Sequence, residues 1–156
     1  MVIVKISLKQ HLAEYLKGKF CDWKDVPVKF PDSSDLYHTI FDLMEKKPSN
    51  VEETAGNLEI VLPDRTIGKD PAWYNFLGER SQRIIERKVE LMFWADLHDL
   101  IDHNKHMHGM EYAETVYFFM RKYDIQSITE DAILKNYYRW REKVRRRDKK
   151  RAYNKC

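Results

Sequence analysis

The residues best suited to bind a ligand are the cationic side chains near the C-terminus. Residues 135–156 contain eleven Lys and Arg against two acids, Glu142 and Asp148, so this segment has a net charge of +9. The whole chain has a net charge of +3, and residues 1–134 must therefore sum to −6. A basic segment on an acidic body predicts one surface that attracts a polyanion, because clustered cations concentrate negatively charged partners around them.

This basic segment has the spacing of an amphipathic helix. Ile133, Tyr137, Trp140 and Val144 recur every three or four residues, which predicts an apolar stripe that packs on the body of the protein. Five cations at helical spacing fall roughly on the opposite side, namely Lys135, Arg139, Lys143, Arg146 and Lys150. We expect cations on that side to neutralise phosphates and release condensed counterions. The candidate phosphate contacts are Lys135, Arg139, Arg141, Lys143, Arg145, Arg146 and Arg147.

Aromatic side chains interleave with these cations. Tyr138 and Tyr153 lie off the apolar stripe, so they are candidates for stacking on unpaired bases. Tyr137 and Trp140 lie on the stripe, and core packing is the expected role for both.

The basic helix is preceded by an expected helix over residues 111–123 and a connection over 124–128. The stretch YAETVYFFMRKYDIQSITEDAILKNYYRWREKVRRR resembles the helix-turn-helix DNA-binding proteins of bacterial phages and mobile elements. The resemblance implies DNA binding, with DNA favoured over RNA, and a homodimer is a possible state. Glu130 and Asp131 occupy the part of the second helix that usually reads bases, and phosphate would repel them. Contact is therefore expected through the back half of the helix, along the phosphate backbone.

A second cluster could bind a metal ion. Asp99 and His103 are four residues apart on an expected helix, as are Asp102 and His106, and imidazole with carboxylate suits zinc or iron. No HExxH motif is present, and His106 and His108 are expected to lie beyond the helix end. A polar helix end explains the cluster more simply, so we predict no metal and no cofactor.

Motifs of enzyme active sites are missing from the sequence. There is no GxSxG and no cysteine nucleophile beside a histidine. Gly68-Lys69-Asp70 fails as a phosphate loop, because Asp70 stands where Ser or Thr is needed. We therefore predict a non-catalytic protein. The alternatives are a protein–protein adaptor or structural protein whose basic tail docks an acidic partner and, more weakly, a metal-dependent enzyme that uses the histidine cluster.

The remaining composition bears on location. Two cysteines, Cys21 and Cys156, form no disulfide framework, which favours a reducing cytoplasm. No apolar run approaches the roughly 20 residues that cross a bilayer. A signal-peptide pattern is also missing at the N-terminus, so no association with a membrane is expected.

The elements that must position these residues fall into two halves. In the first half, alternating residues from Val2 to Ile6 predict a strand, and a helix that begins near Leu8 is expected to stop at Gly18. A further strand is expected over 26–30, a helix after the Asp32–Asp35 cluster that ends at Pro48-Ser49-Asn50, and a strand over 58–62.

The second half is expected to be entirely helical. Asp70-Pro71 predicts a helix start, and apolar residues from Ile85 to Ile101 predict a long helix over 79–103. A helix over 110–123 follows, with Val116 and Tyr117 on its apolar side. A capping-box pattern at Ser127–Glu130, or Thr129 as the cap, begins the last helix. The predicted fold is α+β and mostly helical: a small N-terminal sheet with two helices (1–66), then a C-terminal bundle of three or four helices (67–156).

Overall fold

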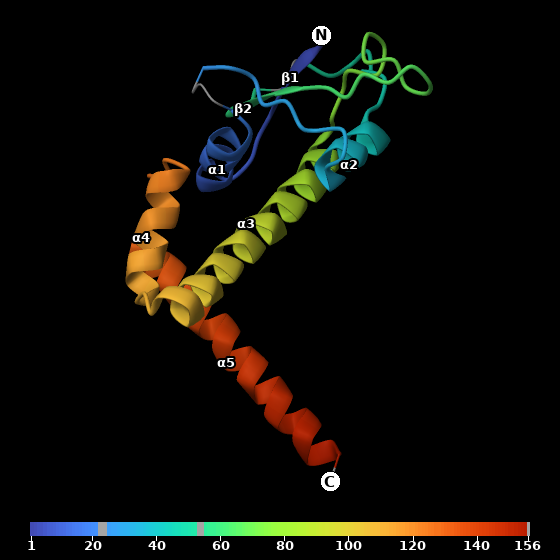
Figure 1. The fold of residues 1–156 in the computed structure, drawn as a ribbon. Helices are drawn as coiled ribbons and strands as arrows, with labels where there is room; N and C mark the ends of the chain where they lie inside the picture. The colour runs from blue at the N-terminus through green and yellow to red at the C-terminus, as the bar shows by residue number, and fades with distance from the viewer. Residues whose placement is uncertain (22–24, 53–54, 156) are drawn as a thin grey trace.

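The computed structural model describes residues 1–21, 25–52 and 55–155, so Cys156 lies outside the described residues. The fold is α+β and mostly helical, as predicted (Figure 1). Among the described residues the elements are β1 (Ile3–Ile6), α1 (Gln10–Phe20), α2 (Asp35–Leu43), β2 (Leu58–Val61), α3 (Glu79–His108), α4 (Tyr112–Lys122) and α5 (Glu130–Asn154). No helix in this part of the chain is long and apolar enough to cross a membrane.

The long helix α3 is the element on which the others pack. α1, α2 and α4 all contact it, and α4 also packs against α5. The side of α3 that faces them carries fully buried residues four apart, among them Val89, Phe93 and Leu97. The apolar periodicity read from the sequence is therefore confirmed. Both halves of the chain contribute to one buried cluster, and the division at residues 66 and 67 stays a prediction.

The sheet is small and antiparallel. Ile3 pairs with Val61 and Ile6 pairs with Leu58, so the strands predicted from Val2 to Ile6 and over 58–62 both form. The prediction of a strand over 26–30 is wrong in extent. This segment forms a single bridge, between Val28 and Ile60 of β2. The Val28 amide donates to the Glu59 carbonyl oxygen at 2.9 Å, and the Val61 amide donates to the Val28 oxygen at 2.9 Å. Pro27 has no amide hydrogen, so pairing cannot extend on that side.

Helix α1 does not stop at Gly18. It continues to Phe20, and Gly18 instead lets α1 approach the end of α4. A Cβ at position 18 would lie 2.7 Å from the Cα atom and 2.7 Å from the carbonyl oxygen of Tyr123. The glycine is thus required by a contact between segments about 100 residues apart, which local sequence reasoning could not reveal.

Replacement of Gly18 by Ala is expected to destabilise the protein. Ala is the better helix former by about 1 kcal/mol, but the new methyl group would overlap backbone atoms that cannot rotate away, at a cost of about 1–3 kcal/mol. Urea unfolding measures the result. Lys17→Ala on the same helix serves as the control, with a change within about 0.5 kcal/mol. A Gly18→Ala protein that is as stable as the control or more stable would contradict the close approach.

Helix α2 begins where expected and ends earlier. The Ser34 side-chain oxygen caps its start and accepts from the Tyr37 amide at 3.2 Å. The helix ends at Leu43, not at Pro48-Ser49-Asn50, because Glu45 exchanges two 3.0 Å backbone hydrogen bonds with Phe76.

The same pairing explains why Asp70-Pro71 starts no helix. The Asp70 carboxylate accepts from the Ala72 amide at 2.9 Å, and its carbonyl oxygen accepts from the amides of Trp73 and Tyr74. One turn forms, and the chain must then become extended at Phe76 to pair with Glu45.

The connections around α4 depart from expectation in two ways. α3 runs past residue 103 to His108, and Gly109 ends it in the left-handed conformation with φ 63°, so His106 and His108 belong to the helix. Helix α4 buries Thr115, Val116 and Phe119, whereas Tyr117 is exposed. The start of α5 is capped by Thr129, whose side chain accepts from the Ala132 amide at 3.2 Å. Ser127 is therefore not the cap.

Candidate nucleic-acid interface

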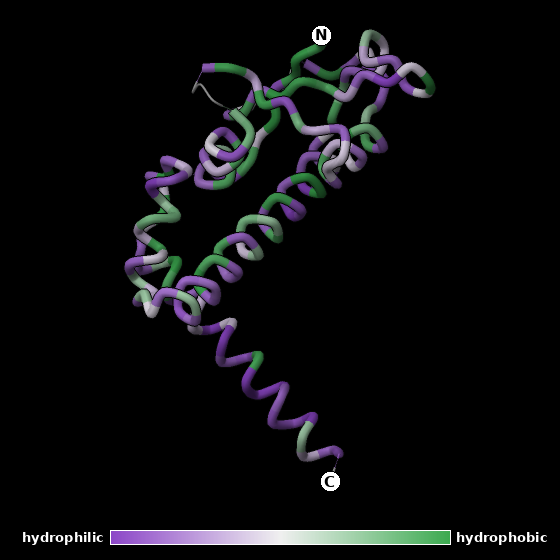
Figure 2. Tube along the Cα trace, in the orientation of Figure 1, coloured by the Kyte–Doolittle hydropathy of each residue, from purple (hydrophilic) through white to green (hydrophobic). Residues whose placement is uncertain are grey.

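The C-terminal part of α5 leaves the body of the protein. Tyr137 is its last buried residue, and no described residue from 138 to 155 is buried. We call this segment, residues 138–155, the basic arm. It extends away from the other elements at the end of the molecule opposite the N-terminus (Figure 1), and hydrophilic residues cover nearly all of its length (Figure 2). Its helical residues, 138–154, span about 25 Å at 1.5 Å each.

An aromatic cluster fixes the base of the arm. The Trp140 ring lies 4.1 Å from the His98 ring of α3, and the Arg141 guanidinium lies over the Tyr112 ring at 5.1 Å. The hydroxyl of Tyr137 donates to the Asp102 carboxylate at 3.4 Å. Two effects raise the pKa of Tyr137 to about 12: burial is the larger, and the negative charge of Asp102 is the next. The tyrosine therefore stays a neutral hydrogen-bond donor where α5 crosses α3.

His98 is the ring of α3 against which Trp140 packs in this cluster. Its Nε2 atom is buried and has no hydrogen-bond partner among the described residues. Burial lowers the pKa of His98 below its ordinary value, although Asp102 and Asp99 favour the charged form. The lowered pKa favours the neutral form of the ring that packs on Trp140 at the base of the arm.

The structure places most of the predicted phosphate contacts on the arm. Five of them are exposed there and point to solvent, namely Arg139, Lys143, Arg145, Arg146 and Arg147. Lys135 is exposed on α5 but precedes the arm, and Arg141 is half-buried over Tyr112. The predicted set omits further exposed cations of the same run, although the charge run itself indicates them: Lys149, Lys150, Arg151 and Lys155.

The apolar stripe predicted for α5 ends sooner than its periodicity indicated. Ile133 and Tyr137 are buried, but Trp140 keeps 39% of its surface exposed and Val144 is half-buried. The stripe stops because no other element lies beside the helix beyond its crossing with α3 (Figure 1). Both sides of the arm are therefore open to solvent, and its cations are not restricted to one face.

The two tyrosines predicted to stack on bases do not form a platform together. Tyr138 is half exposed, with its ring 6.1 Å from that of Tyr112, while Tyr153 is 83% exposed near the end of the helix. Fifteen residues separate them, which corresponds to about 22 Å along a helix.

The structure does not assemble the predicted metal candidates into a site. Asp99, Asp102, His103 and His106 are all exposed on α3, and among the described residues no three His, Cys, Asp or Glu side chains are arranged to hold a metal ion. Asp102 instead accepts from Tyr137, and the ring of His103 lies 5.5 Å from that of His108. The interpretation of this cluster as a polar helix end stays a prediction.

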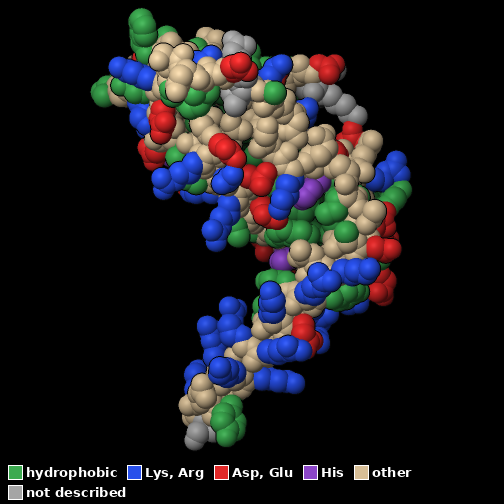
Figure 3. Space-filling view, turned by 180° about the vertical axis from the view of Figure 1, so that it is seen from behind, with side chains coloured by type: hydrophobic (Ala, Val, Ile, Leu, Met, Phe, Trp, Pro, Cys, Tyr) green, Lys and Arg blue, Asp and Glu red, His purple; other side chains and the backbone are tan. Residues whose placement is uncertain are grey.

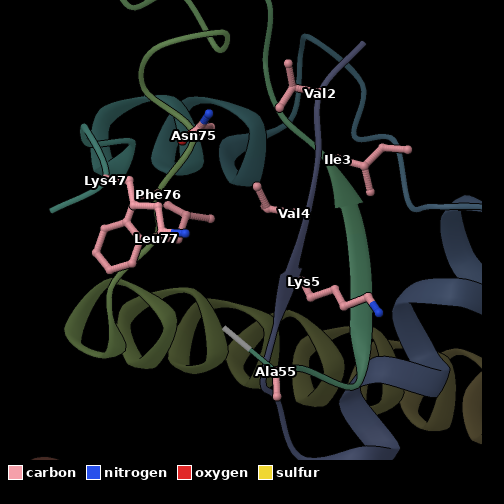
Figure 4. A pocket seen from close by; sticks show the side chains of 9 residues that line it. All are labelled: Val2, Ile3, Val4, Lys5, Lys47, Ala55, Asn75, Phe76 and Leu77. Carbon is pink, nitrogen blue, oxygen red and sulfur yellow. The ribbon is translucent and has the colours of Figure 1, made fainter. Parts of the chain in front are cut away.

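A hollow of about 540 Å³ lies beside β1, and the polar side chains in its lining are Lys5, Lys47 and Asn75. Figure 4 shows that Val2 and Val4 lie on the side of β1 that faces Phe76, whereas Ile3 and Lys5 lie on the other side. This alternation is that of an ordinary strand. The polar groups around the hollow do not converge, so the hollow forms no candidate active site.

The surface charge marks the arm as the strongest candidate interface. Lys and Arg side chains gather along both sides of the arm, while acids and cations are mixed over the body (Figure 3). Exposed guanidinium and ammonium groups at this density suit phosphate ligands. Comparisons of the chain with protein-family models, with curated proteins and with solved structures found no match.

Proposed function

We propose that this chain is a non-catalytic nucleic-acid-binding protein that contacts the phosphates of DNA through the basic arm. The observation that carries the proposal is an exposed helix whose residues from 138 to 155 contain ten Lys and Arg against two acids, Glu142 and Asp148. A helix that extends beyond the body gives its cations access to a ligand without interference from the negatively charged remainder of the chain.

The charge of the arm is largely uncompensated within the protein. In the described residues, the ion pair of the arm joins Arg146 to Glu142 at 3.2 Å, and both side chains are mostly exposed. Exposed ion pairs four residues apart on a helix contribute only about 0.3–0.5 kcal/mol. A phosphate can therefore replace Glu142 at little cost, and no ion pair within the described part of the chain joins another exposed cation of the arm to an acid.

Contact through the far part of α5 also fits the position of the acids. Glu130 and Asp131 lie in the first turn of α5, where they complement the positive end of the helix dipole and would repel phosphate. The proposal places DNA at the other end of the helix. It keeps the DNA binding expected from the helix-turn-helix resemblance, while it moves the contact away from the usual base-reading turn.

The proposal is tested by a salt titration of the affinity for a short DNA duplex of arbitrary sequence. With about five phosphate contacts, the logarithm of the affinity should fall with the logarithm of the salt concentration at a slope of about −4.5. Arg145→Ala/Arg146→Ala/Arg147→Ala should reduce the slope to about −1.8 and weaken binding at least tenfold at 50 mM salt, because about three contacts are lost.

A charge-matched control lies on the body. Arg80, Arg83 and Arg87 are exposed on α3, and their replacement by Ala changes the net charge of the chain by the same amount. This variant should bind within about twofold of the parent. Equal losses in the two triple variants would show that only the net charge matters. No binding at 50 mM salt would contradict the proposal and favour an arm that docks an acidic protein.

A further inference from the structure

The cations of the basic arm surround the helix. Consecutive residues of an α-helix are rotated by about 100° around its axis. Projection of the arm on this basis leaves no sector wider than roughly 80° without a cation, or roughly 120° when only the exposed cations are counted. The cations in this projection are Arg139, Arg141, Lys143, Arg145, Arg146, Arg147, Lys149, Lys150 and Arg151. All of them are exposed except Arg141, which is half-buried at the base.

Cations on all sides of a helix serve a ligand that has phosphates on more than one side. A helix that lies across a single phosphate backbone can use only the cations of one face, and the rest stay in water. A helix between two backbones can use both faces. We propose that the basic arm inserts into the major groove of B-form DNA and contacts phosphates on both walls; this inference rests on the nucleic-acid binding proposed above.

The dimensions of the arm agree with this ligand. An α-helix with its side chains is about 10–12 Å wide, and the major groove of B-form DNA is about 12 Å wide, whereas the minor groove measures about 6 Å. The major groove of A-form RNA is deep and too narrow for side chains to read. Double-stranded DNA is therefore the duplex that can accept the arm.

Single-stranded nucleic acid fits the arm less well. Proteins that bind single strands combine a cationic groove with aromatic side chains on which successive bases stack. On the arm, Trp140 already packs on His98 at 4.1 Å, and Tyr138 and Tyr153 lie about 22 Å apart. The arm therefore presents cations without a continuous stacking surface.

Two pairs of cations on opposite sides of the arm provide a matched test. Lys143 with Arg147 and Arg145 with Lys149 each combine one Lys and one Arg four residues apart, and all four side chains are exposed. The two pairs point roughly 160° apart around the helix. For an arm within a groove, replacement of either pair by Ala should weaken binding to a DNA duplex by at least threefold and lower the salt slope by about 1.8. A loss confined to one pair would overturn the insertion.

The full chain should also bind an open major groove more tightly than one that is filled or narrow. Fluorescence anisotropy compares three duplexes of one sequence: DNA, DNA whose cytosines carry bulky neutral sugars that fill the major groove, and RNA. We expect the filled DNA and the RNA to bind at least tenfold more weakly than unmodified DNA at equal salt. A neutral ligand seated in the minor groove should change the affinity by less than twofold. Equal affinity for all three duplexes would overturn the groove inference and leave the proposed function intact, whereas no binding to any of them would overturn both.

Discussion

Replacement of Phe93 by Ala is expected to lower the free energy of unfolding by about 3–5 kcal/mol. The Phe93 side chain is fully buried on α3 and joins α1 to α4. Its ring meets that of Tyr15 edge-on at 5.2 Å and that of Phe119 edge-on at 5.4 Å. Truncation removes both contacts and leaves a cavity that rigid neighbours cannot fill. Because single domains are stable by only about 5–15 kcal/mol, this loss is a large part of the total.

Urea unfolding followed by circular dichroism measures this loss. Leu91→Ala is the matched control, since Leu91 lies on the same helix two residues away and is 65% exposed. Its change should stay within about 0.5 kcal/mol. A loss below about 1 kcal/mol for Phe93→Ala would show that the ring does not lie at the junction of α1, α3 and α4.

A polar contact beside Phe93 supports the same junction. The hydroxyl of Tyr15 donates to the Asp96 carboxylate, which also pairs with Lys19. Burial, followed by the hydrogen bond to Asp96, raises the pKa of Tyr15 above its ordinary value. The buried tyrosine therefore stays protonated and holds α1 against α3 through a polar contact as well as through its ring.

The elements that could be predicted from the sequence are those that local chemistry specifies. The caps Ser34 and Thr129 stand at the starts of α2 and α5, because a side-chain oxygen satisfies free amides at a helix start whatever surrounds it. The core side of α3 could also be predicted, since four-residue spacing of large apolar residues leaves few other ways to bury them. These features require no knowledge of distant segments.

The errors arose where distant segments meet. Glycine is a residue type that commonly ends helices, but Gly18 lies within α1 and allows the close approach of the Tyr123 backbone. Pro48-Ser49-Asn50 and Asp70-Pro71 have the composition of helix boundaries, but the pairing of Glu45 with Phe76 decides both outcomes. Periodicity in one segment contains no information on these partners, so tertiary pairing overrode local preference.

The candidate interface was predicted in position but not in shape. The charge run located the cations on the last helix, and the apolar spacing correctly placed Ile133 and Tyr137 in the core. The same spacing continues to Trp140 and Val144, so the pattern gave no sign that the body ends at the crossing with α3. Where the body ends depends on the length and direction of α3 and α4, which only the assembled fold determines.

Replacement of Arg147 by Pro is expected to weaken binding to a DNA duplex by up to 10²-fold. Proline in a helix interior costs about 3 kcal/mol, because it lacks an amide hydrogen and its ring clashes with the preceding turn. Position 147 lies well inside α5. If the arm binds DNA as a helix, the cost of holding proline in that helix is subtracted from the free energy of binding. A difference of 1.4 kcal/mol corresponds to a factor of ten in affinity, so the full cost corresponds to the expected loss.

Arg147→Ala separates the loss of helix from the loss of charge. It removes the same cation and retains a strong helix former, so its affinity should fall only a few-fold and its salt slope by about 0.9. Because Tyr137 is the last buried residue of α5, both variants should match the parent in the free energy of unfolding within about 0.5 kcal/mol. Equal affinities of Arg147→Pro and Arg147→Ala would mean that the arm binds as a flexible polycation, whereas a destabilised Arg147→Pro protein would mean that the arm packs on the body.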